Sequence, residues 1–93
     1  MIRSFADTDA EMLWDIGKSR GISANLRKSA LKKLFILHRA LELSELNAPP
    51  GNQLEPLRGD RKGQHSIPIN DQYRICFLWS EGDAYDVEIV DYH

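Results

Sequence analysis

Apolar side chains recur at helical spacing in the first half of this chain and at every second position in the second half. In the first half, the spacing predicts a short helix over residues 11–18 and a longer helix from about residue 23 to residues 42–45. A segment rich in proline, glycine and asparagine over residues 47–52 then ends the helical pattern. The longer helix carries one apolar stripe, formed by Ala30, Leu34, Leu37 and Leu41.

Beyond residue 52, apolar and polar side chains alternate as they do in β-strands. In the last strand, we expect Tyr85, Val87 and Ile89 to share one face. Helices followed by strands predict an α+β fold in one domain over residues 1–93, with two N-terminal helices packed on one face of a small, antiparallel-rich sheet. The expected strands cover residues 53–57, 64–69, 73–80 and 85–91, joined by a loop over 58–63 and by turns over 70–72 and 81–83.

The composition excludes several classes of protein. A hydrophobic content of 42% is too high for a disordered chain, and no apolar run approaches the roughly 18 residues of a membrane span. The single cysteine, Cys76, excludes an internal disulfide and a cysteine-cluster metal site. Because the first residues do not resemble a secretory signal, we expect a cytoplasmic protein with no membrane partner.

Charge is unevenly distributed along the chain, although the net charge is only −2. Residues 17–41 carry seven lysines and arginines and no acidic residue, and residues 58–65 form a second, shorter basic segment. This segregation favours a positive surface on one side of the molecule, as an anionic partner would require. The alternative is that the basic side chains form an ordinary solvated helix surface.

The chain ends in three groups that can move protons or contact a ligand, Asp91, Tyr92 and His93. Histidine is the one side chain that titrates near neutral pH without perturbation, and here it follows a carboxylate and a phenol. The alternative interpretation is a frayed terminus that carries a histidine by accident.

Arg74 occupies an alternating strand on the face opposite Tyr73 and Ile75, where a cation requires an anion or open water nearby. The alternative is a surface arginine that pairs across the strands with Glu88 or Asp86.

Arg58, Arg61 and Lys62 lie in a glycine-flanked loop, with Glu55 and His65 on the strands on either side. Guanidinium and backbone donors in such a loop could hold a phosphate. An ordinary polar loop between two strands is the alternative.

Neighbouring strands lie about 5 Å apart, so the predicted sheet would bring Glu55, Arg58, His65, Arg74 and the end of the chain onto one surface. An acid–base pair with cations suits the attack of a ribose 2′-hydroxyl on the adjacent phosphate, because that reaction needs a base, an acid and positive charge. It needs no metal ion and no cofactor.

Several segments of the chain together form a specific pattern. They are residues 1–5, residues 49–52, the Leu-Glu-Pro-Leu-Arg-Gly-Asp-Arg run of residues 54–61, the Gly-Gln-His-Ser-Ile run of 63–67, the Asn-Asp-Gln-Tyr-Arg-Ile-Cys-Phe run of 70–77 and the Val-Glu-Ile-Val-Asp-Tyr-His ending of 87–93. In these segments the chain resembles HigB-type toxins of the RelE superfamily, from bacterial type II toxin–antitoxin systems, over nearly its whole length.

The resemblance implies a small microbial ribonuclease fold that enters the ribosomal A site and cleaves mRNA. It also implies a cognate antitoxin, a DNA-binding helix-turn-helix protein of the HigA type, which neutralises the toxin and represses the operon. We expect the long helix and an exposed edge of the sheet to contact this partner.

By the family pattern, Arg58 and Arg74 would grip the scissile phosphate, and Asp91, Tyr92 and His93 would form the acid–base end, with His93 as proton carrier. Tyr92 could instead stack on a base. This chain carries Glu55 where some relatives carry a histidine, and it is acidic where such toxins are commonly basic. A carboxylate at residue 55 could serve as the base. The side chains expected to contact RNA are Arg61, Lys62, His65, Lys32 and Lys33.

Two other functions fit the same residues. One is a non-cleaving inhibitor of ribosome function or assembly that binds through the basic helix over residues 27–39. The other is a plain interaction module whose only partner is its antitoxin.

Overall fold

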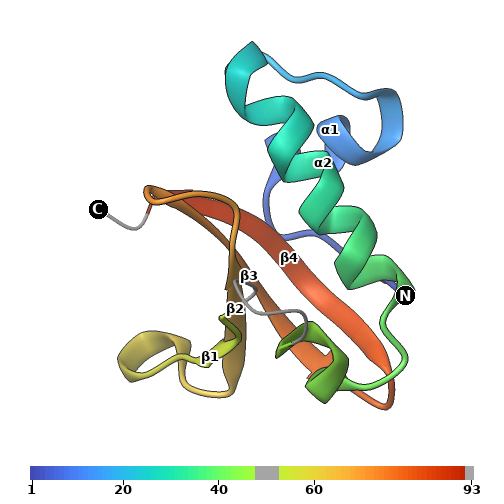
Figure 1. Ribbon diagram of the computed structural model, residues 1–93, viewed down its shortest axis with the longest axis vertical. Helices are drawn as coiled ribbons and strands as arrows, with labels where there is room; N and C mark the ends of the chain where they lie inside the picture. The colour runs from blue at the N-terminus through green and yellow to red at the C-terminus, as the bar shows by residue number, and fades with distance from the viewer. Residues whose placement is uncertain (48–52, 92–93) are drawn as a thin grey trace.

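Helices in the first half and strands in the second half form two layers in the computed structural model, which describes residues 1–47 and 53–91 (Figure 1). The predicted α+β fold, with both helices packed on the sheet, is confirmed. The helices are α1 over Thr8–Ile16, α2 over Ala24–Arg39, and the short 3-10 helices η1 over Leu43–Asn47 and η2 over Gly59–Arg61. The strands are β1 over Glu55–Pro56, β2 over Gln64–Pro68, β3 over Tyr73–Ser80 and β4 over Asp83–Asp91.

The four strands form one sheet in the order β1-β2-β3-β4, and every neighbouring pair is antiparallel. The start of the chain lies along the other side of β4 and pairs with it in parallel, at Ile2 with Ala84 and at Phe5 with Val87. The N-terminal ammonium also lies 3.3 Å from the Asp83 carboxylate. From Ala84 to Val87, both sides of β4 are therefore occupied, by β3 and by the first residues of the chain.

The predicted turn between the last two strands is confirmed, and it consists of Glu81 and Gly82. Both residues have positive φ, at 49° and 84°. Two central residues with positive φ are typical of the two-residue hairpin turn whose twist matches that of the strands.

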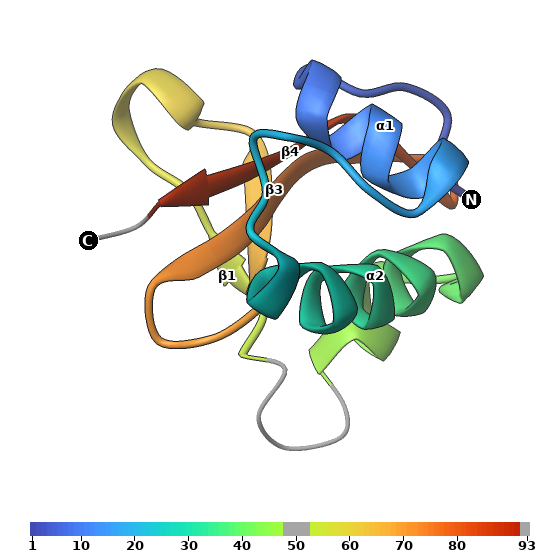
Figure 2. The ribbon, with the colours of Figure 1, turned by 90° about the horizontal axis from the view of Figure 1, so that it is seen from above.

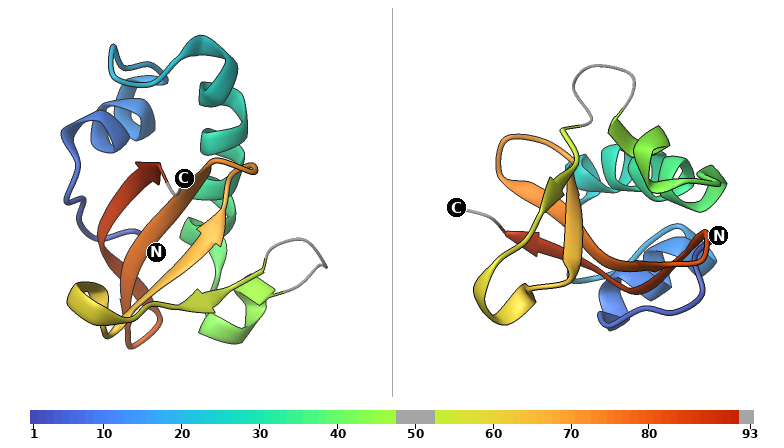
Figure 3. Two further views of the ribbon diagram at one scale, coloured as in Figure 1. Left: turned by 90° about the vertical axis from the view of Figure 1, so that its left-hand side faces the viewer. Right: turned by 90° about the horizontal axis from the view of Figure 1, so that it is seen from below.

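The core lies between the helices and one face of the sheet, and it is a single cluster. Leu13 of α1 and Leu34 and Leu37 of α2 are fully buried there, together with Ile75 and Phe77 of β3. Seen from above, both helices lie next to β4 (Figure 2). In the left panel of Figure 3 the strands lie in front of α2, so the other face of the sheet is turned toward the viewer.

The first helix begins earlier than predicted because Asp7 caps it. The Asp7 carboxylate accepts a hydrogen bond of 2.9 Å from the backbone N–H of Asp9, which satisfies one of the unpaired donors of the first turn. The helix ends at Ile16, and Gly17 follows with a φ of 80°. The helix therefore begins three residues and ends two residues before the predicted span of residues 11–18.

The second helix ends at Arg39 rather than at residues 42–45, because the chain turns into extended backbone at Ala40. The Glu45 carboxylate accepts hydrogen bonds from the backbone N–H groups of Leu41 and Glu42, which stabilises the start of a separate short helix. Leu46 is then fully buried in the core, whereas Leu41 is 76% exposed. The prediction that Leu41 continues the apolar stripe is wrong.

A bulge in β4 changes which of its side chains share a face. Tyr85 pairs with Leu78 and Glu88 pairs with Cys76, so two residues of β4, Asp86 and Val87, lie between these pairs. Asp86 has a φ of 51°, which suits the extra residue of a bulge. The prediction that Tyr85 shares a face with Val87 is therefore wrong.

Candidate functional site

The face of the sheet turned away from the helices carries polar and charged side chains from all four strands. We call it the outer face (Figure 3, left). One cross-strand row on this face runs from β1 to β4 through Glu55, Ser66, Cys76 and Glu88. Arg74 lies beside this row on β3, and Gln64 lies beside it on β2.

Among the described residues, Arg74 is the buried cation of the outer face, since it is only 8% exposed. Its Nε donates a hydrogen bond of 2.8 Å to the Ser66 hydroxyl, and its Nη2 donates bonds of 2.9 Å to the Gln53 carbonyl and 3.2 Å to the Ser66 carbonyl. Because two of these acceptors are main-chain oxygens, the plane of the guanidinium is set by the backbone.

The ion pair of Arg74 differs from the one that the alternative reading of the sequence required. Its cross-strand neighbour on β4 is Val90, and its acidic partner is Glu55, with 3.8 Å between Nη2 and Oε2. Arg74 is therefore not a surface arginine paired with Glu88 or Asp86.

A hollow of about 350 Å³ opens beside the Arg74 guanidinium, between α2 and the β2–β3 turn. Burial, together with the charge of Lys32, lowers the pKa of the Lys33 ammonium in its wall. Two cations thus border one hollow, an arrangement suited to an anion. The hollow is lined by Lys33, Gln53, Pro68, Ile69, Asn70, Asp71 and Arg74.

A second arginine, Arg61 of η2, reaches across the outer face to β4. Its Nη1 donates to the Glu88 carboxylate and, at 3.1 Å, to the Gln64 side-chain oxygen. Burial raises the pKa of the Cys76 thiol, while the charges of Arg61, Glu88 and Arg74 also act on it. These charged groups therefore form one electrostatic cluster around a buried thiol.

His65 does not join this cluster, so the prediction that it shares a surface with Arg74 is wrong. It pairs with Phe77 across β2 and β3 and stacks on that ring, with the centroids 6.4 Å apart. His65 is adjacent to Ser66, and successive side chains of a strand point to opposite faces. Its Nδ1 is buried without a hydrogen-bond partner among the described residues.

The remaining predicted residues are dispersed. Arg58 and Lys62 are exposed on either side of η2, and Lys32 lines a separate hollow on α2. Asp91 pairs with Tyr73 across β3 and β4, so its side chain lies on the face of the sheet opposite Arg74. It accepts a 3.1 Å hydrogen bond from the Gln72 side chain. Tyr92 and His93 lie outside the described residues.

Two residues that orient Arg74 were missed in the sequence. Ser66 is fully buried at a strand position that alternation places on the face of Arg74, so its position could have been predicted. Gln53 contributes only its main-chain carbonyl, for which the sequence carries no signal.

Residues 1–47 and 53–91 hold neither a metal-ligand cluster nor a membrane-spanning helix. No three His, Cys, Asp or Glu side chains in that part of the chain lie together as metal ligands would. No helix there has the length and apolarity needed to cross a lipid bilayer.

Comparison with known proteins identifies sequence relatives over most of the chain. Residues 3–93 match the family model described as the RelE-like toxin of type II toxin–antitoxin system HigB. The chain is 39% identical to Toxin HigB-1 of Vibrio cholerae over 85 residues, which cover 90% of each protein. It is 36% identical to Endoribonuclease HigB of Proteus vulgaris over 93 residues, which cover all of both chains.

Two solved structures share the fold at lower identity. The YoeB–YefM complex from Staphylococcus aureus matches with a TM-score of 0.60 at 18% identity, over 100% of this chain and 95% of that one. YafQ from Escherichia coli matches with a TM-score of 0.56 at 15% identity, over 99% of this chain and 92% of that one. The two-layer arrangement described above is therefore shared with both structures.

Proposed function

Because the chain belongs to the HigB family of RelE-like toxins from type II toxin–antitoxin systems, we propose that it is an endoribonuclease that cuts mRNA on the ribosome. Cleavage of translated mRNA stops protein synthesis and growth. The relative from Proteus vulgaris is named as an endoribonuclease, which supports this activity.

The observation that carries the proposal is the fixed guanidinium of Arg74 beside the hollow that Lys33 also lines. The Nε and Nη2 donors of Arg74 are bonded to Ser66 and Gln53, and the Nη1 donors of the same guanidinium are the ones that would bond a phosphate. A donor oriented before the substrate arrives stabilises developing charge without reorganisation, and each such donor contributes about 10²- to 10³-fold in rate. Arg74 is therefore the proposed stabiliser of the pentacoordinate phosphorus, and Arg58 is its proposed second phosphate contact.

In the proposed reaction, the ribose 2′-oxygen forms a bond to the adjacent phosphorus while the bond from phosphorus to the 5′-oxygen breaks. A base removes the 2′-proton, and an acid supplies a proton to the leaving 5′-oxygen. The products are a 2′,3′-cyclic phosphate and a 5′-hydroxyl, and the reaction requires no metal ion.

His93 is the proposed proton carrier, with Asp91 and Tyr92 as its neighbours in the chain. Glu55 is the proposed alternative base, because its carboxylate already lies 3.8 Å from the Arg74 guanidinium. A phosphate on Arg74 would compete with this carboxylate. The substitutions His93→Ala and Glu55→Gln separate the two roles, since the true base is the one whose loss flattens the acid limb of the pH–rate profile.

The proposed partner is a cognate antitoxin of the DNA-binding, helix-turn-helix, HigA-like type. It would neutralise the toxin and repress its operon. The proposed site of action is the cytoplasm, where ribosomes translate mRNA.

Mapping of mRNA 5′ ends tests the proposal, with the parent, Arg74→Lys and His93→Ala expressed in cells and added to purified mRNA with and without translating ribosomes. We expect new 5′ ends for the parent only when ribosomes translate, and their loss in both variants. Arg20→Ala is the control, because Arg20 is exposed in the connection between α1 and α2. Variants that cut as much mRNA as the parent would contradict the proposal.

The same experiment distinguishes the second candidate function. Arg74 and Arg61 each face a carboxylate, Glu55 and Glu88, which offsets the positive charge that RNA would meet. This observation favours a non-cleaving inhibitor of ribosome function or assembly. Growth arrest without new 5′ ends would support that function instead.

A further inference from the structure

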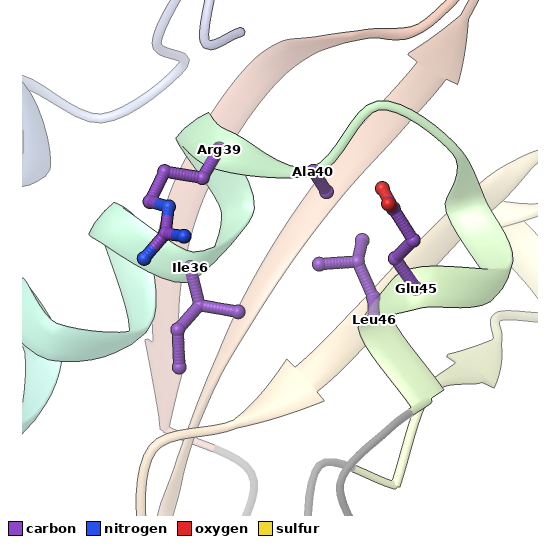
Figure 4. A pocket seen from close by; sticks show the side chains of 5 residues that line it. All are labelled: Ile36, Arg39, Ala40, Glu45 and Leu46. Carbon is purple, nitrogen blue, oxygen red and sulfur yellow. The ribbon is translucent and has the colours of Figure 1, made fainter.

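The side of α2 that faces solvent carries two adjoining hollows, which share Ile36 and Arg39 in their walls. Their volumes are about 200 Å³ and 320 Å³. Figure 4 shows the first, which lies between the end of α2 and η1. We call the two together the α2 groove, formed by Lys32, Phe35, Ile36, Arg39, Ala40, Glu45 and Leu46.

The α2 groove exposes apolar surface that the core does not use. Phe35 is 47% exposed, and Leu41, which follows the groove residue Ala40, is 76% exposed. The floor of the groove is also apolar, since Leu46 is fully buried. Exposed apolar surface around a groove is typical of a site that another protein covers.

The charges around the groove indicate the kind of partner. Lys32 and Arg39 line it, and the Arg39 guanidinium lies 5.6 Å from the centre of the Phe35 ring. Its one carboxylate, Glu45, accepts hydrogen bonds from the N–H groups of Glu42 and Leu41, which lower the pKa of that carboxyl. The carboxylate is therefore engaged by the backbone of η1, while α2 itself carries five lysines and arginines and no acidic residue.

We propose that the α2 groove binds an acidic, amphipathic helix of the antitoxin, a proposal that rests on the proposed function above. The apolar side of that helix would cover Phe35 and Ile36, and its carboxylates would face Lys32 and Arg39. Helices that place one apolar face in a groove are a common mode of recognition. An RNA base could stack on Phe35, but the aliphatic side chains of Ile36 and Leu46 offer no stacking surface, so they favour a protein partner.

The groove shares no lining residue with the hollow beside Arg74. Substitutions of Phe35 and Arg39 should therefore leave mRNA cleavage unchanged, whereas Lys32 is also one of the side chains expected to contact RNA. This separation lets binding of the antitoxin and catalysis be tested independently on the same protein.

The test measures the affinity of the purified toxin for the purified antitoxin encoded beside its gene. The variants are Phe35→Ser and the charge reversals Lys32→Glu and Arg39→Glu. We expect Phe35→Ser to weaken the affinity by roughly 10- to 100-fold, as loss of a central aromatic anchor does. The charge reversals should weaken it as well, and their effect should shrink at high salt.

Ile16→Ser is the matched control, because Ile16 is 60% exposed but lies on α1, outside the groove. It should bind the antitoxin like the parent. Thermal unfolding checks that the exposed substitutions leave the fold intact.

Three outcomes would overturn the proposal. The first is parent-like affinity in Phe35→Ser and Arg39→Glu, and the second is a loss of affinity in Ile16→Ser alone. The third is a Phe35→Ser or Arg39→Glu variant that binds the antitoxin fully but no longer cuts mRNA on ribosomes, since the groove would then contact ribosomal RNA. A parent that binds no antitoxin at all would contradict the proposed function itself and the groove proposal with it.

Discussion

The outer face of the sheet and the α2 groove both carry cations, but they hold them differently. On the outer face, Arg74 is 8% exposed and bonded to main-chain carbonyls and a buried hydroxyl. In the α2 groove, Lys32 and Arg39 are exposed beside a half-exposed phenylalanine.

This difference indicates what each surface can recognise. A guanidinium bonded to the backbone presents its donors in one geometry, which suits a small anion such as a phosphate. Exposed cations on flexible stems, next to apolar side chains, adapt to the surface of another protein. The positions of the cations alone would not distinguish phosphate binding at the outer face from protein binding at the α2 groove.

Arg74→Ala should have the largest effect. We expect cleavage to fall by about 10²- to 10³-fold, because a preorganised donor to the phosphate is lost. The free energy of unfolding should also fall by about 1–3 kcal/mol, since buried acceptors on Ser66 and Gln53 lose their donor. Cleavage assays and urea denaturation measure both effects, and Arg39→Ala is the control. If Arg39→Ala slows cleavage as much, the distinction between the two surfaces is wrong.

Ser66→Ala should have a smaller effect on the same surface. The Arg74 guanidinium would lose the hydroxyl that accepts from Nε, so we expect cleavage to fall by about tenfold, the equivalent of one hydrogen bond to a charged group. In an Arg74→Lys background, Ser66→Ala should add little further loss. An undiminished effect in that background would mean that Ser66 acts on the fold and not through Arg74.

Loss of the ion pair between Arg61 and Glu88 should have a smaller effect than either substitution above, and the effect is on the free energy of unfolding. Both side chains are partly exposed, so a double-mutant cycle with Arg61→Gln and Glu88→Gln should give a coupling of about 0.5–1 kcal/mol in the free energy of unfolding. The coupling should decrease at high salt. A coupling of zero would show that the link between η2 and β4 does not stabilise the outer face.

Glu45→Gln should have the smallest effect on the free energy of unfolding. It tests whether the Glu45 carboxylate of the α2 groove is held by the backbone at the start of η1. The N–H groups of Glu42 and Leu41 lower the pKa of Glu45 in the folded protein, so the ionised carboxylate stabilises the fold above its unfolded pKa. This stabilisation is lost as the pH falls through the lowered pKa. Unfolding measured from pH 6 to pH 2 should therefore depend less on pH in Glu45→Gln than in the parent, and an equal dependence would contradict the assignment.

The fold could be predicted where burial alone decides the positions of side chains. Ile75 and Phe77 alternate with Arg74 and Cys76, and the structure places the first two in the core with the helices. The turn at residues 81–83 was also predictable, because a hairpin turn requires positive φ and glycine adopts positive φ more easily than other residues do.

The prediction failed where one residue changes the register. The bulge at Asp86 moves Tyr85 to the other face, and nothing in the alternating pattern of β4 marks that extra residue. His65 lies on the face of Phe77 and not on that of Arg74, because the face of each β2 side chain is set by the register of β2 against β3, which proximity of the strands alone does not give. α2 ends early where Glu45 accepts hydrogen bonds from Leu41 and Glu42 at the start of η1, and the apolar spacing does not predict η1.

Within the candidate site, Arg74 was identifiable because a cation inside an apolar strand is unusual. Its orientation was not predictable, since it depends on the Gln53 carbonyl, 21 residues earlier in the chain. The role of His93 is a prediction that His93→Ala tests, and the roles of Arg58, Lys62 and Tyr92 stay predictions from the sequence.

The pairing of the first residues with β4 has a consequence for how copies of this protein meet. It covers a strand edge that would otherwise offer a row of unsatisfied amides to a neighbouring molecule. At the opposite border of the sheet, β1 is only two residues long and one of them is Pro56, which cannot donate. Among the described residues, then, β1 and the part of β4 from Ala84 to Val87 give an incoming strand little template, so crowded copies should resist polymerising by strand addition there.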